Sequence, residues 1–546
     1  MAGLSPAVAD ATRRNRMERA RPHYLTLDGG QIRLWRRGEG ADLVVVGGLT
    51  LAAEALANRL AALNPGWRVT AIELPGIGGS TPLAPVTVEA VASTVGKAIE
   101  LAGFGDFVLV AHQLAAGLLP LLWKSLGERV RTVAVGGGWA GRWKETVGGD
   151  LDIAPRQDGA HLNMLWHHLR DRQLLRPDNP HMPAKDGDII SGADELSQTF
   201  VAAATRPEAY AGLWKTCLDA QPSAAPEGCI CVDTLSDVCA ALEGIDLPAG
   251  GVALPKAAAL PGKAVWHEAV QTRRGLVHLR RCGGEGTPLL VIPTGGGSSA
   301  QFEPVVTGLA EGRQVFSVDY FGNGLSEKLD RDVTVAMLAD DMAALIEAMG
   351  FDRVDIWGSH TGSLVGLELA VRRPELVRKA VLEGPVFIDP DFQADLLDNY
   401  FPRIVPDKWG LHLQLIWHWR RDMFMYWPWY RVDRAAARDL GVPSAEDLHL
   451  YAVGILESGP TYDQAYRSAF KYDTASRLPL LKRPALICAG PNDMLVNGVE
   501  ESEKLKVPGV RTTLTPTTVW WPAPEPDAAA ATLVLYDDYL RDEAGV

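Results

Sequence analysis

The sequence predicts an α/β protein of two tandem domains, each with a mostly parallel sheet that helices cover on both faces. Three observations support this prediction. Short apolar runs alternate with amphipathic stretches, matching segments recur about 247 residues apart, and a segment rich in Pro, Gly and Ala at residues 247–262 separates the two series. Strands that alternate with helices form parallel sheets covered on both faces, so each series predicts one layered domain.

The repeat rests on segments that match in the same order in both halves of the chain. The matched pairs are residues 43–48 and 290–295, 73–80 and 319–326, 103–104 and 350–351, and 161–171 and 412–422. Because the offset drifts by so little along the chain, we interpret the sequence as a tandem duplication. The linker then places an N-terminal domain at residues 1–254 and a C-terminal domain at residues 255–546.

Apolar patterning predicts the elements of the second domain. Five short apolar runs are expected to form buried strands, and two amphipathic stretches are expected to form helices. The predicted strands are residues 288–293, 314–318, 354–357, 379–382 and 485–489, and the predicted helices are residues 337–349 and 363–371. A helical insertion rich in Trp at about residues 390–475 interrupts this order, and the first domain has its own insertion at about residues 140–225.

The composition is typical of a globular protein and argues against several functions. The chain has 53 Lys and Arg against 67 Asp and Glu, a net charge of −14, which disfavours general binding to nucleic acid. No run of about 18 uncharged apolar residues is present, so no segment is expected to span a membrane. The six cysteines form neither a disulfide framework nor a zinc pattern. We therefore expect a cytoplasmic protein that binds no metal and no cofactor.

Three motifs in the second domain point to a known family. One strand ends in Thr-Gly-Gly-Gly at residues 294–297, and another ends in Asp-x-x-Gly-x-Gly-x-Ser at residues 319–326. A third strand runs into Gly-Ser-His-Thr-Gly at residues 358–362 and then into a helix, which is the context of a nucleophile elbow. This order of motifs resembles the α/β-hydrolase superfamily over about residues 270–540, and more weakly over residues 23–245.

The resemblance implies two α/β-hydrolase-like domains whose insertions form lids over a cleft. It also implies an oxyanion hole at Gly295, Gly296 and Thr361. The chemistry departs from the family, because His360 stands in the place of the nucleophilic serine. Ser359 lies one position earlier, where side chains normally point away from the cleft. In the first domain Gln113 takes the same place, so we expect that domain to be inactive.

The other members of a triad would follow the elbow as an acid and then a histidine. Asp493, which follows the strand predicted at residues 485–489, is the acid. The last of the 12 histidines is His449, so no histidine follows Asp493 and a Ser-His-Asp triad in the usual order is impossible. We expect His360 to act as acid, base or nucleophile with Asp493 as its partner. The alternative is a degenerate elbow in which His360 only bonds a backbone carbonyl.

Candidate substrate-binding residues lie in the second insertion and on a late loop. His412, Trp417 and His418 belong to the Trp-rich insertion, and Trp520 and Trp521 fall on the loop that closes the cleft in the superfamily. Aromatic side chains that are concentrated in one segment, as the Trp residues are in this insertion, can line an apolar pocket. The alternative is that they form the core of the lid or a contact between the two copies, and that the lid histidines are structural.

These observations favour a cofactor-independent enzyme that acts on a small hydrophobic or aromatic substrate. The resemblance implies hydrolysis of an ester, thioester, amide or carbon–carbon bond, with His360 replacing the serine nucleophile. The alternatives are a lyase, decarboxylase or isomerase that uses His360 as its acid–base group, and a non-catalytic pseudo-hydrolase that binds a ligand. We expect a small-molecule substrate as partner, neither nucleic acid nor membrane, and two halves that pack as a pseudo-dimer, with further homo-oligomers left open.

Overall fold

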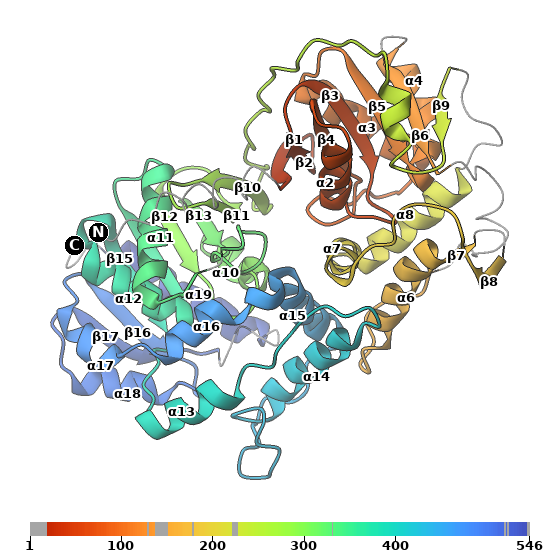
Figure 1. Ribbon diagram of the computed structural model, residues 1–546. Helices are drawn as coiled ribbons and strands as arrows, with labels where there is room; N and C mark the ends of the chain where they lie inside the picture. The colour runs from red at the N-terminus through yellow and green to blue at the C-terminus, as the bar shows by residue number, and fades with distance from the viewer. Residues whose placement is uncertain are drawn as a thin grey trace. The chain divides into compact units, whose positions relative to one another are not determined.

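The computed structural model describes residues 19–127, 130–136, 151–176, 179–220, 228–329, 331–517, 520 and 524–542. The chain divides into two compact units. Unit 1 comprises Met1–Pro155, Ala160–Ala258 and Asp407–Gly410, and unit 2 comprises Arg156–Gly159, Ala259–Pro406 and Leu411–Val546. Each unit contains one large mixed sheet surrounded by helices, so the predicted α/β class is confirmed (Figure 1).

The sheet of unit 2 has eight strands in the order β10-β11-β13-β12-β14-β15-β16-β17. Their bounds are β10 Trp266–Gln271, β11 Leu276–Cys282, β12 Thr287–Ile292, β13 Arg313–Val318, β14 Val354–Ser359, β15 Val377–Glu383, β16 Ala485–Ala489 and β17 Val510–Leu514. Only the pairs β10–β11 and β11–β13 are antiparallel, and the remaining neighbours pair in parallel. The carboxyl ends of the parallel strands therefore lie at one edge, where loops can bring side chains together.

All five strands predicted for the second domain are present in this sheet. Each begins and ends within two residues of its predicted bounds. The pattern did not predict β10, β11 or β17. In β11 the reason is that the buried residues His278 and Arg280 interrupt the apolar run, and β17 is largely exposed or half-buried.

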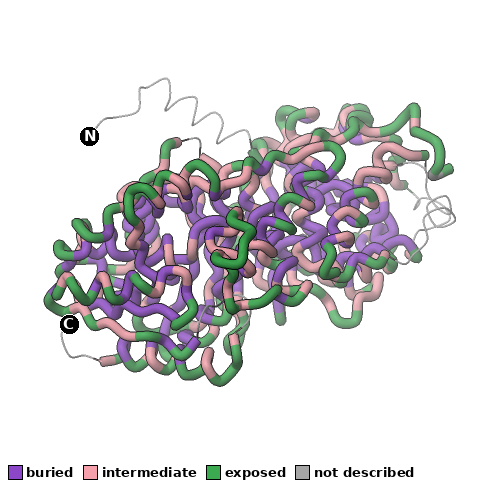
Figure 2. Tube along the Cα trace, turned by 90° about the horizontal axis from the view of Figure 1, so that it is seen from below, coloured by how far each residue is buried: buried purple, intermediate pink, exposed green. Residues whose placement is uncertain are grey.

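Side chains from both faces of this sheet are buried. Leu290 and Ile292 of β12 belong to one apolar cluster, whereas Leu289 and Val291 belong to another, together with Trp357 of β14. Successive residues of a strand point to opposite faces, so the two clusters are the cores above and below the sheet. Figure 2 shows the buried residues in the interior and the exposed residues along the outside.

Helices of unit 2 cover the sheet and build the insertion. Both predicted helices are present, as α11 Val335–Ala348 and α12 Thr361–Arg372. The insertion between β15 and β16 is helical, as expected from the sequence, and consists of α13 Pro390–Asn399, α14 Leu411–Met425, α15 Ala445–Ser458, α16 Asp463–Phe470 and α17 Thr474–Arg477. Three further helices are α10 Glu303–Gly308, α18 Asn497–Lys504 and α19 Pro526–Arg541.

The sheet of unit 1 has seven strands in the order β1-β2-β4-β3-β5-β6-β9. Its bounds are β1 Arg21–Leu27, β2 Gly30–Arg37, β3 Ala41–Gly47, β4 Trp67–Glu73, β5 Phe107–His112, β6 Arg131–Val135 and β9 Ile230–Val232, with main helices α2 Ala53–Leu63, α3 Val88–Ala102, α4 Leu119–Leu126, α6 Ala160–Leu174, α7 Ala193–Ala204 and α8 Pro207–Asp219. The first six strands repeat the order found in unit 2.

Parts of the predicted insertion, residues 140–150, 177–178 and 221–225, lie outside the described residues. Among the residues that the structure describes, no helix is both long and apolar enough to cross a bilayer.

Candidate active site

His360 lies at the apex of a sharp turn between β14 and α12. Its backbone has φ 49° and ψ −108°, a left-handed conformation that is strained for a residue with a side chain. The flanking glycines permit the turn, because a Cβ atom at Gly358 would lie 2.3 Å from the carbonyl oxygen of Gly362, and one at Gly362 would lie 2.0 Å from that of Ile292. The segment therefore has the strand–turn–helix geometry of a nucleophile elbow, with an imidazole at its apex.

Asp493 binds this imidazole directly. The distance from His360 Nε2 to Asp493 Oδ2 is 2.9 Å. The second carboxylate oxygen of Asp493 accepts a hydrogen bond of 2.8 Å from the backbone N–H of Leu495, which orients the carboxylate. The Asp493 side chain is 1% exposed and that of His360 is 19% exposed, so solvent reaches only the histidine. The predicted pair thus lies in contact, although 133 residues separate its members.

The charges of the pair stabilise each other. Burial by itself lowers the pKa of His360, but the Asp493 carboxylate outweighs this effect and raises the pKa above its ordinary value. Burial would raise the pKa of Asp493, yet the imidazole and the Leu495 N–H hold it below its ordinary value. Both shifts have the signs expected for opposite charges in contact. The imidazole is consequently a stronger base than an isolated histidine.

Gly384, the residue after β15, leaves room for the imidazole ring. It has φ 61°, and a Cβ atom at this position would lie 2.3 Å from Cδ2 and 2.7 Å from Nε2 of His360. The Cδ2–Nε2 edge of the ring therefore faces Gly384 and Asp493. The opposite edge, which carries Nδ1, points away from both.

Gly384→Ala is expected to reduce turnover at least tenfold, because the new methyl group must displace the His360 ring and misplaced catalytic groups lose much of their effect. The matched control is Gly350→Ala, since Gly350 also has a positive φ, of 74°, but has no atom within 4 Å of the position of a Cβ atom. Both variants place alanine at a positive φ, and steady-state kinetics at a temperature where both remain folded should separate them. Equal activity in the two variants would contradict the steric role of Gly384.

Glu383 is a buried carboxyl group that no motif in the sequence indicates. It ends β15, and its backbone carbonyl accepts a 2.8 Å hydrogen bond from the N–H of His360. Its Oε2 atom accepts hydrogen bonds from the Tyr536 hydroxyl at 2.6 Å and from Trp520 Nε1 at 3.1 Å. Burial raises the pKa of Glu383 to about 7. The only sequence signal was a charged residue at the end of an apolar strand beside the elbow strand.

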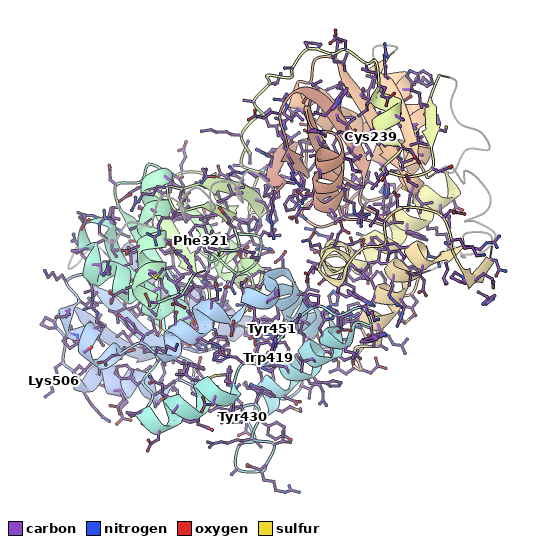
Figure 3. The ribbon with its side chains drawn as sticks, in the orientation of Figure 1. Cys239, Phe321, Trp419, Tyr430, Tyr451 and Lys506 are labelled. Carbon is purple, nitrogen blue, oxygen red and sulfur yellow. The ribbon has the colours of Figure 1, made fainter. Side chains whose placement is uncertain are left out.

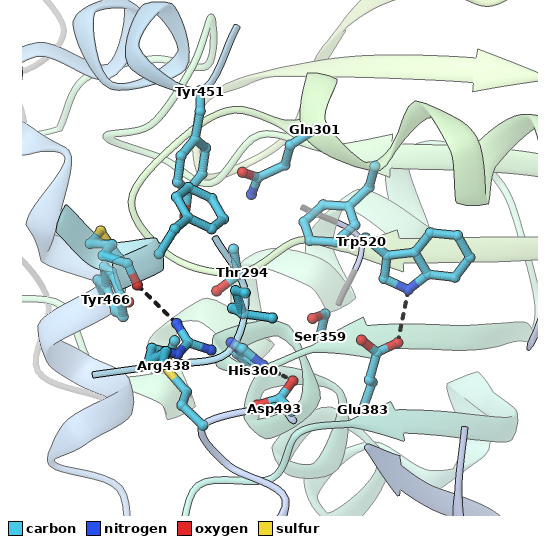
Figure 4. A pocket seen from close by; sticks show the side chains of 15 residues that line it. Thr294, Gln301, Ser359, His360, Glu383, Arg438, Tyr451, Tyr466, Asp493 and Trp520 are labelled. Atoms are coloured by element: carbon cyan, nitrogen blue, oxygen red, sulfur yellow. Dashed lines mark hydrogen bonds and ion pairs between the residues drawn. The ribbon is translucent and has the colours of Figure 1, made fainter. Parts of the chain in front are cut away.

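These groups line one cavity of about 70 Å³. Figure 4 shows His360, Asp493 and Glu383 along one side of the cavity, with Arg438 and Tyr466 beside His360 and Tyr451 farther away. The complete lining is Thr294, Gln301, Phe302, Ser359, His360, Glu383, Met423, Phe424, Arg438, Leu440, Tyr451, Tyr466, Asp493, Met494 and Trp520. Aromatic and apolar side chains thus share the lining with seven polar or charged side chains, and a concave site that combines both kinds suits a small molecule. Ser359 is part of this lining, although the sequence analysis expected it to point away from the cleft.

The predicted oxyanion loop follows β12 beside the elbow. A Cβ atom at Gly295 would lie 2.8 Å from Oγ1 of Thr361, so this loop and the first residue of α12 are in close contact. A Cβ atom at Gly296 would lie 2.7 Å from the Tyr466 ring. The guanidinium of Arg420 in α14 donates a hydrogen bond to the carbonyl oxygen of Gly296 and so fixes the loop. The assignment of this loop as an oxyanion hole stays a prediction.

Of the four predicted substrate-binding residues that the structure describes, one lines the cavity. Trp520 lines the cavity. His412 and Trp417 are buried, but neither belongs to the cavity lining, and His418 is exposed. Trp521 lies outside the described residues. The aromatic wall comes instead from Phe302, Phe424, Tyr451 and Tyr466, together with Trp520.

Unit 1 keeps the turn of the elbow without an ionisable group at its apex. Gln113, the first residue of the short 3-10 helix η1 Gln113–Leu118 that follows β5, has φ 48°. A Cβ atom at Gly136 would lie 3.1 Å from Gln113 Cγ, as the one at Gly384 would approach His360. No group of three or more metal-binding side chains occurs in the part of either unit that the structure describes.

Comparisons with known proteins are consistent with this geometry. A sequence model described as alpha/beta hydrolase fold matches residues 287–414. The chain is 35% identical over 219 residues to a protein of Pseudomonas syringae pv. syringae named as a carbamate hydrolase, RutD, and the match covers 38% of this chain and 77% of that protein.

Two further relatives match shorter segments. A protein of Pseudomonas savastanoi pv. phaseolicola, also named as a carbamate hydrolase RutD, is 35% identical over 106 residues, 19% of this chain and 41% of the relative. A 2-hydroxymuconate semialdehyde hydrolase of Pseudomonas putida is 34% identical over 119 residues, 21% of this chain and 41% of the relative. In these two comparisons the chain spans about two fifths of the length of the relative.

Proposed function

Because the chain belongs to the α/β-hydrolase family, we propose that unit 2 is a cofactor-independent hydrolase of a small substrate, with His360 as its catalytic base. The observation that carries the proposal is the hydrogen bond between His360 Nε2 and Asp493 at the apex of the elbow. No serine stands at that apex, so the reaction needs another way to generate a nucleophile. We infer that this nucleophile is water.

The hydrogen bond to Asp493 defines which nitrogen acts. The ionised Asp493 carboxylate only accepts hydrogen bonds, so Nε2 carries the proton and Nδ1 offers its lone pair. Nδ1 takes a proton from a water molecule, and the water oxygen forms a bond to the carbonyl carbon of an ester, thioester or amide. The tetrahedral intermediate then breaks its bond to the leaving group, which receives the proton from Nδ1. The backbone N–H groups near Gly295, Gly296 and Thr361 would stabilise the oxyanion.

A proton-transfer reaction, as in an isomerase or lyase, is the second candidate. It is favoured by one observation, the presence in one cavity of an imidazole base and of Glu383, whose pKa of about 7 leaves a neutral carboxyl group available near neutral pH. Such a reaction needs a base, an acid and stabilisation of an enolate, and needs no water. Analysis of the products separates the two candidates, because only hydrolysis yields an acid together with an alcohol, thiol or amine.

The proposal is tested with the full chain and a panel of short-chain and aromatic esters and thioesters. We expect acid and alcohol, or acid and thiol, to be released in equal amounts. We expect kcat/KM to rise with pH through an inflection above 6.5, because His360 must lose its proton to act as base and Asp493 raises its pKa. Turnover that falls over this range, or no turnover of any member, would contradict hydrolysis by His360.

A further inference from the structure

Arg438 lies in the same cavity as His360 and has an unsatisfied donor. It belongs to the segment between α14 and α15, and Figure 4 shows its guanidinium beside the imidazole. The Nη1 atom donates a hydrogen bond of 2.8 Å to the carbonyl oxygen of Met423. The Nη2 atom is buried and has no hydrogen-bond partner among the described residues. A buried charged donor without a partner is costly, so this atom is positioned for a group that enters the cavity.

No ion pair with a described residue holds this guanidinium, although the charge of the Asp493 carboxylate partly offsets the effect of its burial. Among the described residues, no carboxylate lies within ion-pair distance of Arg438, and Asp493 in the same cavity is bonded to His360 and Leu495. Burial accordingly lowers the pKa of Arg438. An anion bound at Nη2 would supply both the missing hydrogen bond and the missing charge.

A second arginine makes this side of the cavity more positive. Arg420 of α14 is fully buried, and its guanidinium lies 3.6 Å from the ring centroid of Tyr451 and 4.6 Å from that of Trp419. Both aromatic residues are labelled in Figure 3, close together in unit 2. Within the described parts of the chain, Arg420 also has no carboxylate at ion-pair distance. An anionic group is therefore favoured on the side of the insertion.

The geometry points to a substrate that carries its own carboxylate, which Arg438 binds while the scissile carbonyl faces His360. This inference rests on the proposed hydrolase function and names its substrate class. A guanidinium pairs best with a planar carboxylate. The cavity of about 70 Å³ corresponds to roughly five to seven water-sized positions, which suits a short acid rather than a lipid or a polymer. The half-ester of a short dicarboxylic acid fits these requirements.

Binding is tested first, by calorimetric titration of the full chain with malonate and, as the neutral counterpart, with malonamide. We expect malonate to bind and malonamide to bind at least 30-fold more weakly. Arg438→Gln should weaken malonate binding by about 30-fold or more, because it removes the charged partner of a buried anion. The matched control is Arg434→Gln, an exposed arginine of the same segment, which should leave binding unchanged. Equal binding of malonate and malonamide, or malonate binding unchanged in Arg438→Gln, would overturn the inference.

Turnover distinguishes this inference from the proposed function. We expect monomethyl malonate to be hydrolysed with a kcat/KM at least tenfold above that of dimethyl malonate, and we expect Arg438→Gln to abolish this preference, so that the ratio of the two kcat/KM values falls to about one. Hydrolysis of both esters with no preference would retain the hydrolase and refute the carboxylate site. Arg438-dependent binding of malonate without hydrolysis of any ester would retain the site and refute the hydrolase.

Discussion

Replacing His360 by alanine is expected to reduce kcat/KM on the best ester of the panel by about 100- to 10,000-fold, the usual contribution of a positioned general base. The substitution removes the Nδ1 atom that accepts the proton of water. Among the described residues, it also leaves the Leu495 N–H as the one remaining hydrogen-bond partner of the buried Asp493 carboxylate. Initial rates at saturating and limiting ester concentrations measure the loss.

Because His360→Ala also removes a hydrogen-bond partner of the buried Asp493 carboxylate, a second variant is needed that separates loss of the base from loss of stability. His360→Gln supplies an amide that can donate to Asp493 but cannot accept a proton at neutral pH. Gln113 occupies the same strained turn in unit 1 with φ 48°, so glutamine is compatible with this backbone. We expect His360→Gln to be as inactive as His360→Ala and to unfold thermally near the wild-type temperature. His418→Ala, an exposed histidine of α14, should remain fully active. A His360→Gln variant with wild-type turnover would contradict the role of His360 as base.

The turn at His360 and the place of Asp493 could be predicted from motifs that resemble the α/β-hydrolase superfamily, because these motifs are local in the sequence and the order of the strands determines where they lie. In unit 2 the turn needs Gly358 and Gly362, because Cβ atoms at these positions would lie 2.3 Å and 2.0 Å from backbone carbonyl oxygens. Asp493 follows β16, a continuous apolar run, and the carboxyl ends of parallel strands meet at one edge. Both signals are local in the sequence. That the two residues lie at the same edge of the sheet follows from the fold class.

Glu383 and Arg438 could not be predicted, because their properties depend on distant partners. The pKa of Glu383 results from burial and from hydrogen bonds to Tyr536 and Trp520, which lie 153 and 137 residues away. Arg438 belongs to an irregular segment without periodicity, and only the packing of that segment places it in the cavity. The same limit applies to α14. Its spacing predicted a helix, but not that Trp417 would pack away from the cavity.

Glu383→Gln is expected to change how stability depends on pH. The pKa of this carboxyl group rises from 4.5 to about 7 on folding because of burial. Between these two values the folded protein retains a proton that the unfolded chain has released, so unfolding becomes more favourable as the pH rises. The shift corresponds to about 3 kcal/mol of stability that is present below pH 4.5 and lost by the time the pH passes 7. The glutamine side chain cannot ionise, so the variant should not lose this stability as the pH rises.

The measurement is urea unfolding of the wild type and the variant between pH 4.5 and 8. Hydrogen–deuterium exchange of peptides from unit 2 reports the unfolding of the unit that contains Glu383. Because the glutamine carbonyl can still accept hydrogen bonds from Tyr536 and Trp520, the two proteins should differ little at pH 4.5. The variant should then gain about 3 kcal/mol relative to the wild type by pH 8. Glu285→Gln, on the exposed turn before β12, provides the control and should follow the wild type at every pH. A constant difference between wild type and Glu383→Gln across this range would mean that Glu383 is already ionised at low pH, and the cavity would then hold two carboxylates beside one imidazole.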